Sequence, residues 1–429
     1  MAIEYEINEV SARAALVGLI TGSGAGESEK SLDELERLLE TAGGSAVIRL
    51  TQSREAPDVR TVLGSGKISE LAYLCSVNEI NLVVFDLELS PSQIRNIEDI
   101  LGDGVRVIDR SMLILDIFAL HAVTGEGKLQ VELAQLRYTA PRLSGHGTEM
   151  SRLGGGIGTR GPGESKLESD RRHMKKRIAM LEERLAEMEK NRAAMRATRD
   201  SSGIVKVAIV GYTNAGKSTL LNRLTDAGIL AEDKLFATLD PTTRKYKLPC
   251  GETILLTDTV GFINKLPHHL VKAFKSTLEE ACYADILIIV TDASDPEGDR
   301  QLEVTEHTLA ELGAIGKPTV YVFNKCDRGV TVTRKVGVES DATAPVVYIS
   351  ALTGQGIELL VNTIESLVLS GKRRVTFNIP VNEAGALNTL YKNAVVENVD
   401  YGDEFISVTA LADAKVRGMM KKYFDTEQN

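Results

Sequence analysis

The segment GYTNAGKS at residues 211–218 has the residue types and spacing of a loop that binds phosphate. Gly211 and Gly216 allow backbone N–H groups to turn inward around an anion. Lys217 supplies a positive charge for the phosphates, and the Ser218 hydroxyl can coordinate Mg²⁺. The apolar run before this segment predicts a strand, and the run after it predicts a helix whose N-terminus favours anions. The segment is therefore expected to bind a nucleoside phosphate.

A second motif, DTVG at residues 258–261, ends the predicted strand ETILLTD. The Asp258 carboxylate can hold Mg²⁺ through a water molecule, and the Gly261 N–H can contact the γ-phosphate. Many enzymes of this type orient the attacking water with a Gln directly after this motif. Here Phe262 takes that position and cannot orient water, which predicts slow intrinsic hydrolysis that needs help.

Two further motifs indicate which base is bound. In NKCD at residues 324–327, the Asp327 carboxylate can accept from N1–H and N2–H of guanine, whereas adenine lacks the N2 amine. A site built for those bonds rejects the analogue by a factor on the order of 10⁴. Ser350, Ala351 and Leu352 follow an apolar strand and can offer backbone N–H groups to the guanine oxygen. The order of the motifs indicates a GTPase rather than an ATPase.

The segment LFATLDPTTR at residues 235–244 lies between the first two motifs and fits a nucleotide-dependent switch. Such a switch needs a Thr that binds Mg²⁺ and the γ-phosphate only in the GTP state. Thr238, Thr242 and Thr243 are all candidates from the residues alone. Within the phosphate loop, Asn214 could ligate a monovalent cation such as K⁺; the alternative is that it only stabilises the turn.

The composition is ordinary for a water-soluble chain: of 429 residues, 43% are hydrophobic and 26% are charged. No apolar run approaches the ~20 residues of a membrane span, and the acidic N-terminus lacks a signal-peptide pattern. The four cysteines are scattered and the histidines form no ligand-spaced set, which argues against zinc and disulfides. We expect a reduced, cytoplasmic protein that is monomeric when free, with no catalytic metal beyond Mg²⁺.

The N-terminal part of the chain alternates strand and helix patterns. Apolar runs predict strands at 13–20, 45–50, 81–86 and 105–109, and amphipathic patterns predict helices at 29–43, 68–77 and 92–101. This alternation indicates an α/β domain with a parallel sheet. The glycine-containing loops at 22–28 and 63–71 lack phosphate-loop spacing, so we interpret them as turns; RNA contact or a second nucleotide site is the alternative.

The apolar period then changes to the heptad spacing of a coiled coil. A second helix, at about 166–197, carries one apolar seam that only Arg171 and Arg192 interrupt. The stretch between the two helices is rich in glycine. Two heptad helices joined by a loop predict an antiparallel hairpin over 123–200, with its glycine-rich tip loop at 141–165.

Residues 198–203, TRDSSG, look like a linker to the nucleotide-binding domain, which we place at 201–371. Residues 372–429 show the order strand, helix, strand, strand, helix. The predicted fold is therefore a multidomain α/β chain. It has an N-terminal α/β domain at 1–122, the antiparallel coiled-coil helical hairpin at 123–200, a P-loop GTPase domain and a small α+β C-terminal domain.

One segment is basic within an acidic chain. Residues 152–199 hold 13 Lys and Arg residues against 7 Asp and Glu residues, whereas the whole chain has a net charge of −10. Such a segment can contact RNA through phosphates, and its glycines let the backbone approach closely. The alternatives are a linker and a solvated helix face. The candidates for RNA contact are Arg142, Arg152, Arg160, Arg171, Arg172, Lys175 and Lys176.

Several of these motifs together resemble the HflX family, within the Obg-HflX group of GTPases. The resemblance rests on FATLDPTTR, DTVGFI, GKLQVELAQL and the glycine-rich GGIG and RGPGE elements, and covers roughly residues 45–370. It implies that the Mg²⁺ threonine of the switch is Thr238 and that Asn214 serves K⁺. It also implies that an apolar residue such as Phe262 is usual after DTVG.

The resemblance further implies a GTPase that associates with the large (50S) ribosomal subunit, through rRNA contacts of the hairpin tip and the N-terminal domain. Such a protein separates stalled or idle 70S ribosomes, or acts in rescue or assembly. Mg²⁺ is expected on Ser218, on Thr238 and, through water, on Asp258. The residues expected to bind the nucleotide are Gly211, Tyr212, Thr213, Asn214, Ala215, Gly216, Lys217, Ser218, Phe236, Ala237, Thr238, Leu239, Asp240, Asp258, Thr259, Val260, Gly261, Asn324, Lys325, Cys326, Asp327, Ser350, Ala351 and Leu352.

Two other interpretations stay open from the residues alone. In the first, the coiled coil recruits a protein partner or a second copy through Ile178, Leu181 and Leu185, and RNA is not involved. In the second, the N-terminal domain adds ATP-driven remodelling of RNA. Salt dependence separates the first from RNA binding, because RNA contacts release counterions.

The base motif makes a direct prediction. Asp327→Asn replaces an acceptor with a group that can donate, so it should shift preference from GTP toward XTP, whose base has an oxygen in place of the N2 amine. Competition binding with both nucleotides measures the shift. An unchanged preference would remove this account of base selection.

Overall fold

The computed structural model describes most of the chain, in two compact units. The first unit comprises Met1–Arg192, Glu232–Asp240 and Ile263–Thr277, and the second comprises Ala193–Ala231, Pro241–Phe262 and Leu278–Asn429. The residues described are 12–21, 25–142, 162–201, 204–225, 228, 234–236, 239–265, 280–314, 316–332, 344–412 and 414–423. No helix in these described ranges is long and apolar enough to cross a membrane.

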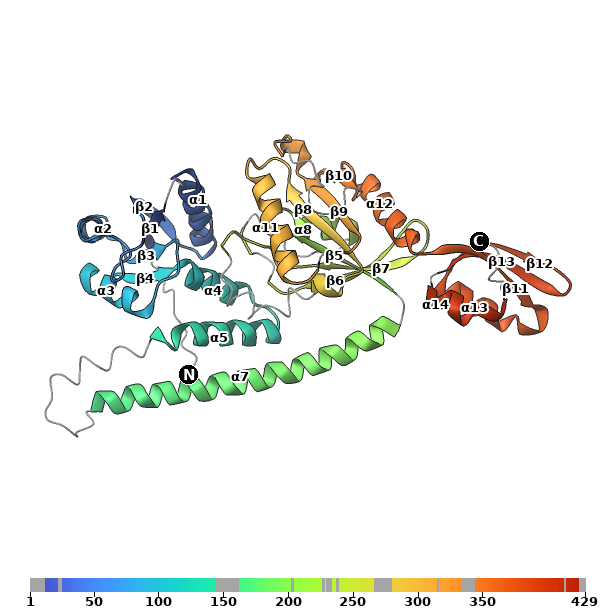
Figure 1. Ribbon diagram of the computed structural model, residues 1–429, viewed down its shortest axis with the longest axis horizontal. Coiled ribbons are helices and arrows are strands. Elements are labelled where there is room, and N and C mark those ends of the chain that lie inside the picture. The colour runs from blue at the N-terminus through green and yellow to red at the C-terminus, as the bar shows by residue number, and fades with distance from the viewer. Residues whose placement is uncertain are drawn as a thin grey trace. The chain divides into compact units, whose positions relative to one another are not determined.

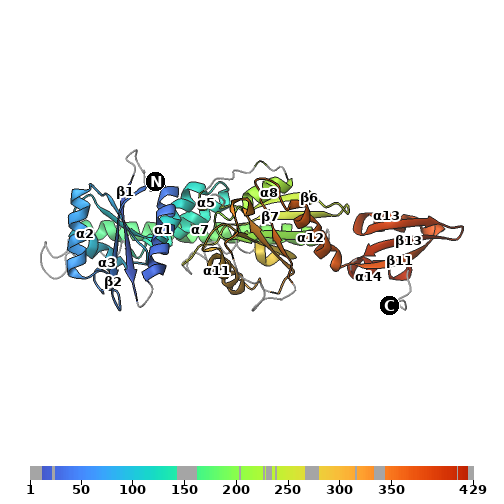
Figure 2. The same cartoon turned by 90° about the horizontal axis from the view of Figure 1, so that it is seen from above.

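The first unit begins with a four-stranded parallel sheet, as the alternating pattern predicted. Its strand order is β2-β1-β3-β4. Helix α1 covers one face, and helices α2 and α3 cover the other (Figure 2). Because both faces are covered, the two central strands β1 and β3 are apolar along most of their length, and Ala14 to Val17 have no exposed surface. The elements are β1 (Arg13–Ile20), α1 (Ala25–Thr41), β2 (Ser45–Ser53), α2 (Ser65–Val77), β3 (Leu82–Phe85), α3 (Pro91–Leu101) and β4 (Arg106–Asp109).

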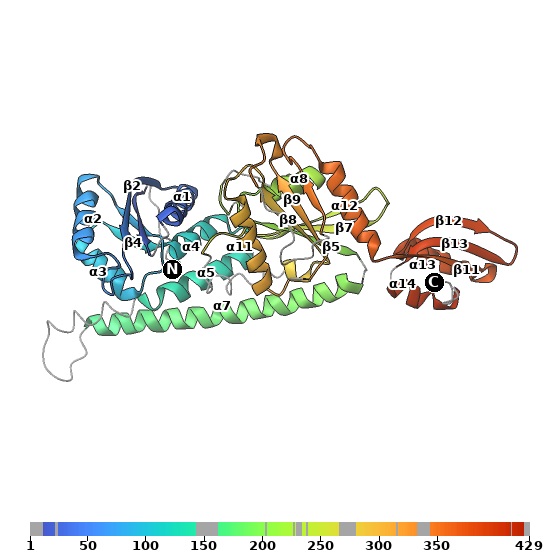
Figure 3. The same ribbon diagram turned by 45° about the horizontal axis from the view of Figure 1, so that its top comes forward.

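Among the described residues, the helices that follow the sheet are α4 (Arg110–His121), α5 (Gly125–Thr139) and α7 (Pro162–Ser201). Helix α5 lies beside α7 (Figure 3), and ion pairs join them, Glu126 to Arg192 and Arg137 to Glu182, each at 2.7 Å. Because the lower-numbered residue of α5 pairs with the higher-numbered residue of α7, the two helices run in opposite directions there. The glycine-rich residues 143–161 lie outside the described residues.

One expectation about the helices needs correction. The long helix spans 40 residues, about 60 Å, and continues to Ser201, so most of the expected linker at 198–203 is helical. Its partner α5 is much shorter and begins at Gly125, close to the expected start of the hairpin at 123.

The second unit contains a six-stranded sheet of order β10-β9-β8-β5-β7-β6 (Figure 1). All neighbours are parallel except β6 and β7. The carboxyl ends of parallel strands meet at one edge, where such sheets bind ligands. The elements are β5 (Val205–Gly211), α8 (Lys217–Thr225), β6 (Thr242–Lys247), β7 (Thr253–Asp258), β8 (Ile286–Asp292), α11 (Gly298–Glu311), β9 (Thr319–Asn324), η2 (Cys326–Arg328), β10 (Val346–Tyr348) and α12 (Ile357–Ser370).

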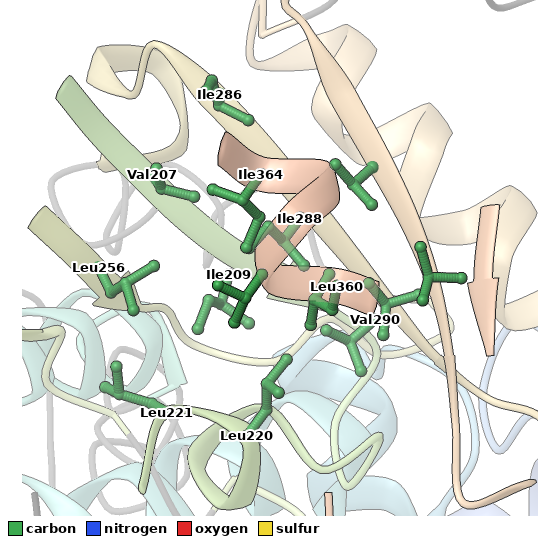
Figure 4. Close-up of a cluster of buried hydrophobic side chains, with 14 of the residues drawn as sticks. Val207, Ile209, Leu220, Leu221, Leu256, Ile286, Ile288, Val290, Leu360 and Ile364 are labelled. Atoms are coloured by element: carbon green, nitrogen blue, oxygen red, sulfur yellow. The ribbon is translucent and has the colours of Figure 1, made fainter. Parts of the chain in front are cut away.

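The core of this sheet packs strand residues against α8 and α12 (Figure 4). Ile209, Ile288 and Val290 from the strands, Leu220 from α8 and Leu360 from α12 have no exposed surface. This packing fixes α8 directly behind the phosphate loop, so the loop is held at both of its ends.

A separate three-stranded antiparallel sheet, of order β11-β13-β12, follows in the same unit. The order of its elements is the one predicted from the sequence. Phe377, Leu390 and Val408, from three different elements, are fully buried in its core. The elements are β11 (Arg373–Pro380), η3 (Val381–Glu383), α13 (Gly385–Asn393), β12 (Val395–Tyr401), β13 (Phe405–Ala412), α14 (Ala414–Met419) and η4 (Lys421–Tyr423).

Candidate nucleotide site

The phosphate loop depends on two glycines that no other residue could replace without strain. Gly211 ends β5 with φ +151°, and a Cβ there would lie 2.1 Å from the Val290 carbonyl oxygen. Gly216 has φ +93°, and a Cβ there would lie 2.3 Å from Nδ2 of Asn324. Both positions combine a left-handed backbone with a close approach. The loop therefore has the geometry that its glycine spacing predicted.

Asn214 lies in the same loop with φ +59°, a conformation that Asn tolerates better than most residues. Its carbonyl oxygen accepts a hydrogen bond from Nζ of Lys325 at 3.0 Å. These observations support the interpretation that Asn214 stabilises the turn. Its role as a K⁺ ligand stays a prediction.

Lys217 is buried at the start of α8, where Nζ donates to the Tyr212 carbonyl oxygen at 2.8 Å. Burial lowers the pKa of Lys217 to about 8, and the nearby Asp258 carboxylate opposes that shift. The lowered pKa indicates that this one carboxylate offsets only part of the cost of burying the ammonium. Phosphate groups would supply that charge, so the side chain is suited to bind them.

Asp258 ends β7, and its side chain is fully buried. Oδ2 accepts a hydrogen bond from Oγ of Ser218 at 2.6 Å, while Oδ1 is buried and has no hydrogen-bond partner among the described residues. Burial raises the pKa of Asp258, and Lys217 and Ser218 act in the opposite direction. A carboxylate and a hydroxyl with spare oxygen capacity are the donor set that Mg²⁺ takes beside phosphates, so these residues fit the ion.

The DTVG motif is tied to the phosphate loop through backbone atoms. The Thr213 N–H donates to the Phe262 carbonyl at 2.7 Å, and the Phe262 N–H donates to the Gly211 carbonyl at 3.1 Å. A Cβ at Gly261 would lie 2.6 Å from Cα of Thr213 and 2.9 Å from Nζ of Lys217. Phe262 is 1% exposed, so it serves the core and has no group that could orient water.

The base-recognition motif is held by buried polar contacts. Nδ2 of Asn324 donates to the Ala215 carbonyl at 2.9 Å, and its Oδ1 accepts from the Ala351 N–H at 2.9 Å. Lys325 pairs with Asp292 at 2.7 Å. Asp327 is exposed in η2, where a carboxylate can meet an incoming base. The side-chain amide of Asn324 therefore connects the phosphate loop, the NKCD motif and the SAL loop, which is the segment at residues 350–352.

The SAL loop closes on itself after β10. Oγ of Ser350 accepts from the Thr353 N–H at 3.1 Å, and Ser350 has no exposed surface. Leu352 is 71% exposed, so this part of the loop faces solvent. Among the other predicted nucleotide residues in the described ranges, the buried ones are Gly211, Tyr212, Thr213, Ala215, Lys217, Phe236, Leu239, Asp258, Thr259, Val260, Gly261, Asn324 and Ala351.

Residues of the expected switch belong to the first unit. Phe236 packs edge to face on Phe118 of α4, with ring centroids 4.7 Å apart, and the Asp240 carboxylate contacts Val123 and Thr124. The side chains of both residues, which we expected at the nucleotide, are thus engaged with the helical region. Ala237 and Thr238 lie outside the described residues.

The residues directly after DTVGFI also belong to the first unit. Nζ of Lys265 lies 2.7 Å from the Asp86 carboxylate, which also accepts from Nη1 of Arg110 at 2.8 Å. Nη2 of Arg110 donates to the Asn264 carbonyl at 3.1 Å and also pairs with Glu34. Nothing local in the sequence marks this ionic cluster, because its members are far apart along the chain.

The RNA-contact candidates divide into three groups. Arg142 is engaged within the chain: Nη2 donates to the Leu89 carbonyl at 3.1 Å and lies 3.5 Å from Asp109, and the guanidinium stacks on Tyr138. Arg171, Arg172, Lys175 and Lys176 are exposed on α7. Arg152 and Arg160 fall outside the described residues.

Two residues that support the loops of the site were not predicted from the sequence. Asp292 anchors Lys325, and Nη2 of Arg223 donates to the Thr353 carbonyl at 3.0 Å. Asp292 could have been found, because it ends a buried strand at the edge where parallel sheets bind ligands. Arg223 had no signal, since a charged residue on a helix is most often only solvated.

Comparison with known proteins decides the family. Three family models match: GTP-binding GTPase N-terminal at residues 29–119, GTP-binding GTPase Middle Region at 121–199 and 50S ribosome-binding GTPase at 206–325. The GTPase HflX of Lacrimispora saccharolytica is 50% identical over 411 residues, covering 96% of each chain. The chain belongs to the HflX family. The Escherichia coli GTPase HflX is 43% identical over 369 residues, 86% of each chain.

Among solved structures, a GTP-binding protein of Sulfolobus solfataricus in complex with GDP is 28% identical, with a TM-score of 0.44. That match covers 83% of this chain and 99% of the other.

Membership in the HflX family and the site geometry together make the chain a GTPase that converts GTP and water to GDP and phosphate. We expect the loop amides and Lys217 to bind the phosphates, and the Asp327 carboxylate to select guanine. A bound Mg²⁺ would neutralise charge that develops on the phosphate oxygens. Phe262 takes the position after DTVG and cannot orient the attacking water. We therefore expect catalysis to come from positioning of the phosphates and from electrostatic stabilisation.

The pKa of Lys217 predicts proton uptake on GTP binding. Without nucleotide its pKa is lowered to about 8, so at pH 8.5 about three quarters of Lys217 is neutral. Phosphates favour the charged form, so binding should take up most of a proton at that pH, and affinity should fall as the pH rises through 8. Calorimetry in two buffers of different ionisation enthalpy measures the uptake. Binding at pH 8.5 without net proton uptake would contradict the assigned role of Lys217.

Proposed function

We propose that the chain is a GTP-gated switch that binds the large (50S) ribosomal subunit through its basic helical region and separates or rescues stalled ribosomes. The observation that carries this proposal is the exposed basic face of α7. Arg171, Lys175 and Lys176 are exposed there, directly after the glycine-rich stretch. The description of the family model at 206–325, 50S ribosome-binding GTPase, supports the same partner.

The arrangement of charge supports RNA as the partner, rather than an acidic surface of some other protein. The basic residues are concentrated in 152–199, while the whole chain has a net charge of −10. An acidic molecule is repelled by RNA except where a basic segment can approach it, so contact is favoured at that segment. The hairpin tip and the N-terminal sheet domain are the parts that we place on rRNA.

The bound nucleotide controls whether the protein binds the ribosomal subunit. With GTP, the switch containing Thr238 would bind Mg²⁺ together with Ser218 and, through water, Asp258. Because Phe262, at the position directly after DTVG, cannot orient water, hydrolysis is expected to be slow until the partner assists it. We further infer that K⁺ binds at Asn214, that the free protein is monomeric, and that it acts in the cytoplasm.

A coiled-coil contact with a protein partner is less well supported. Leu181, at the centre of the apolar seam, has no exposed surface. Ile178 and Leu185 are also partly covered. Since much of the seam is used within the chain, little apolar surface is left for a partner at these positions.

Co-sedimentation with purified 50S subunits tests the proposal. We expect the full chain to pellet with a non-hydrolysable GTP analogue and not with GDP, and binding to fall steeply with salt. Reversing charge on the basic face, with Lys175→Glu and Lys176→Glu, should abolish pelleting.

The matched control is the same change further along the same helix, Arg184→Glu with Lys190→Glu, which should pellet like the original chain. Equal pelleting by both double variants, or binding that ignores the nucleotide, would contradict the proposal.

A further inference from the structure

The carboxylate of Asp292 lies at the carboxyl end of β8, beside the loop that selects the base. Parallel pairing places Asp292 opposite Asn324, the last residue of β9. The backbones also meet there, because the Ala293 N–H donates to the Asn324 carbonyl oxygen at 2.7 Å. Asp292 is therefore a direct neighbour of the NKCD motif, although the two are far apart along the chain.

Both oxygens of this carboxylate have defined partners. Oδ1 accepts hydrogen bonds from the N–H group of Ser294 at 2.9 Å and from its hydroxyl at 2.7 Å. Oδ2 lies 2.7 Å from Nζ of Lys325. The side chains of Lys325 and Asp292 are only 18% and 14% exposed, so water and salt screen this ion pair less than a surface pair. The turn at Ser294 thus directs one carboxylate oxygen at Lys325.

Lys325 needs such partners because its backbone has an unfavourable conformation. Its φ is +62°, in the left-handed region that residues other than Gly, Asn and Asp seldom adopt. A residue stays in this region only where the surrounding contacts fix it. Besides pairing with Asp292, Nζ of Lys325 donates to the carbonyl oxygen of Asn214, which is also left-handed, with φ +59°. One ammonium group therefore joins two left-handed residues, one in the phosphate loop and one in the base loop.

The backbone of Lys325 also determines where the base-selecting carboxylate lies. Lys325 is the N-cap of η2, and Asp327 lies within this short helix. The Arg328 N–H donates to the Lys325 carbonyl oxygen at 3.0 Å, which closes the turn around Asp327. A change in the dihedral angles of Lys325 would therefore move Asp327.

We propose that Asp292 is a positioning residue for guanine nucleotides: by holding Lys325 against Asn214, its carboxylate fixes the phosphate loop and the Asp327 loop relative to each other. Without this negative charge, Lys325 would be a largely buried cation facing a neutral carbonyl, which is costly in a medium of low dielectric constant. The two loops would then relax to bring the ammonium to water. The contacts reach the base loop and the turn of the phosphate loop, so binding of GDP and of GTP should depend on them alike. This role does not need the ribosome.

Equilibrium binding of GDP and of a non-hydrolysable GTP analogue to the full chain tests the proposal. Asp292→Asn keeps the shape of the side chain and an acceptor for Ser294, but it places an uncharged amide against the ammonium of Lys325. We expect both affinities to fall by about 10-fold, within the range of coupling energies between contacting residues. Unchanged affinities, or a loss confined to the GTP analogue, would overturn the proposal.

The matched control is Asp295→Asn, which changes the next carboxylate along the same loop. Oδ1 of Asp295 accepts from the Glu297 N–H at 2.9 Å and Oδ2 accepts from Nε2 of Gln301 at 2.8 Å, so this carboxylate supports the start of α11. Its removal should lower the unfolding temperature and leave both affinities within about 2-fold of the original chain. A loss of affinity as large as that of Asp292→Asn would show that any loosening of this loop weakens binding, and would overturn the proposal.

A double-mutant cycle shows whether Asp292 acts through Lys325. Lys325→Gln should weaken binding at least as much as Asp292→Asn, and the double variant should bind no more weakly than Lys325→Gln alone. Losses that multiply in the double variant would show two independent roles and overturn the proposal. The double variant also replaces the ion pair with two neutral amides, so it leaves no unpaired charge between these positions. If Asp292→Asn alone failed to fold, folding of the double variant would show the same coupling through stability, whereas failure of both would overturn the proposal.

Discussion

The side-chain amide of Asn324 holds the nucleotide site together. It donates to the phosphate loop at Ala215 and accepts from the SAL loop at Ala351, and it is 2% exposed. Its approach to the phosphate loop is also what requires glycine at 216. Losing this amide would leave two buried backbone groups unpaired, at a cost of about 1–3 kcal/mol each. Phosphate binding and base selection are thus supported by one residue.

Further contacts connect the loops of the nucleotide site to one another. Lys325 connects the same loop to Asn214 and to Asp292, while backbone bonds of Phe262 connect DTVG to the phosphate loop. The segments around Asp240 and Lys265 belong to the first unit and make their contacts within that unit. Among the described residues the site is built from backbone geometry and fixed charges, so its chemistry depends on how accurately its own contacts place them.

The sequence predicted the parts of this structure that are encoded locally. The phosphate loop, DTVG and NKCD were recognisable because each function needs particular residues at fixed spacing within a few positions. The parallel and antiparallel sheets followed from apolar runs and their alternation with helices. The linker expected at 198–203 was wrong, because Ser and Asp lower helix propensity only weakly at the end of a long helix.

Long-range contacts could not be predicted in the same way. Asp240 and Thr124 are 116 positions apart, and Lys265 and Asp86 are 179 apart. Neither pair has a local signature, because each contact joins residues that are far apart along the chain. The contacts of Arg142 with Leu89 and Asp109 could not be predicted for the same reason, since these partners lie 53 and 33 positions away.

The central claim is that this GTPase hydrolyses GTP slowly by itself and relies on its partner to complete the site. Single-turnover hydrolysis by the full chain, with and without purified 50S subunits, tests it most directly. We expect the subunits to raise the rate at least about tenfold, or about 1.4 kcal/mol of the barrier. The same rate with and without subunits would contradict the account.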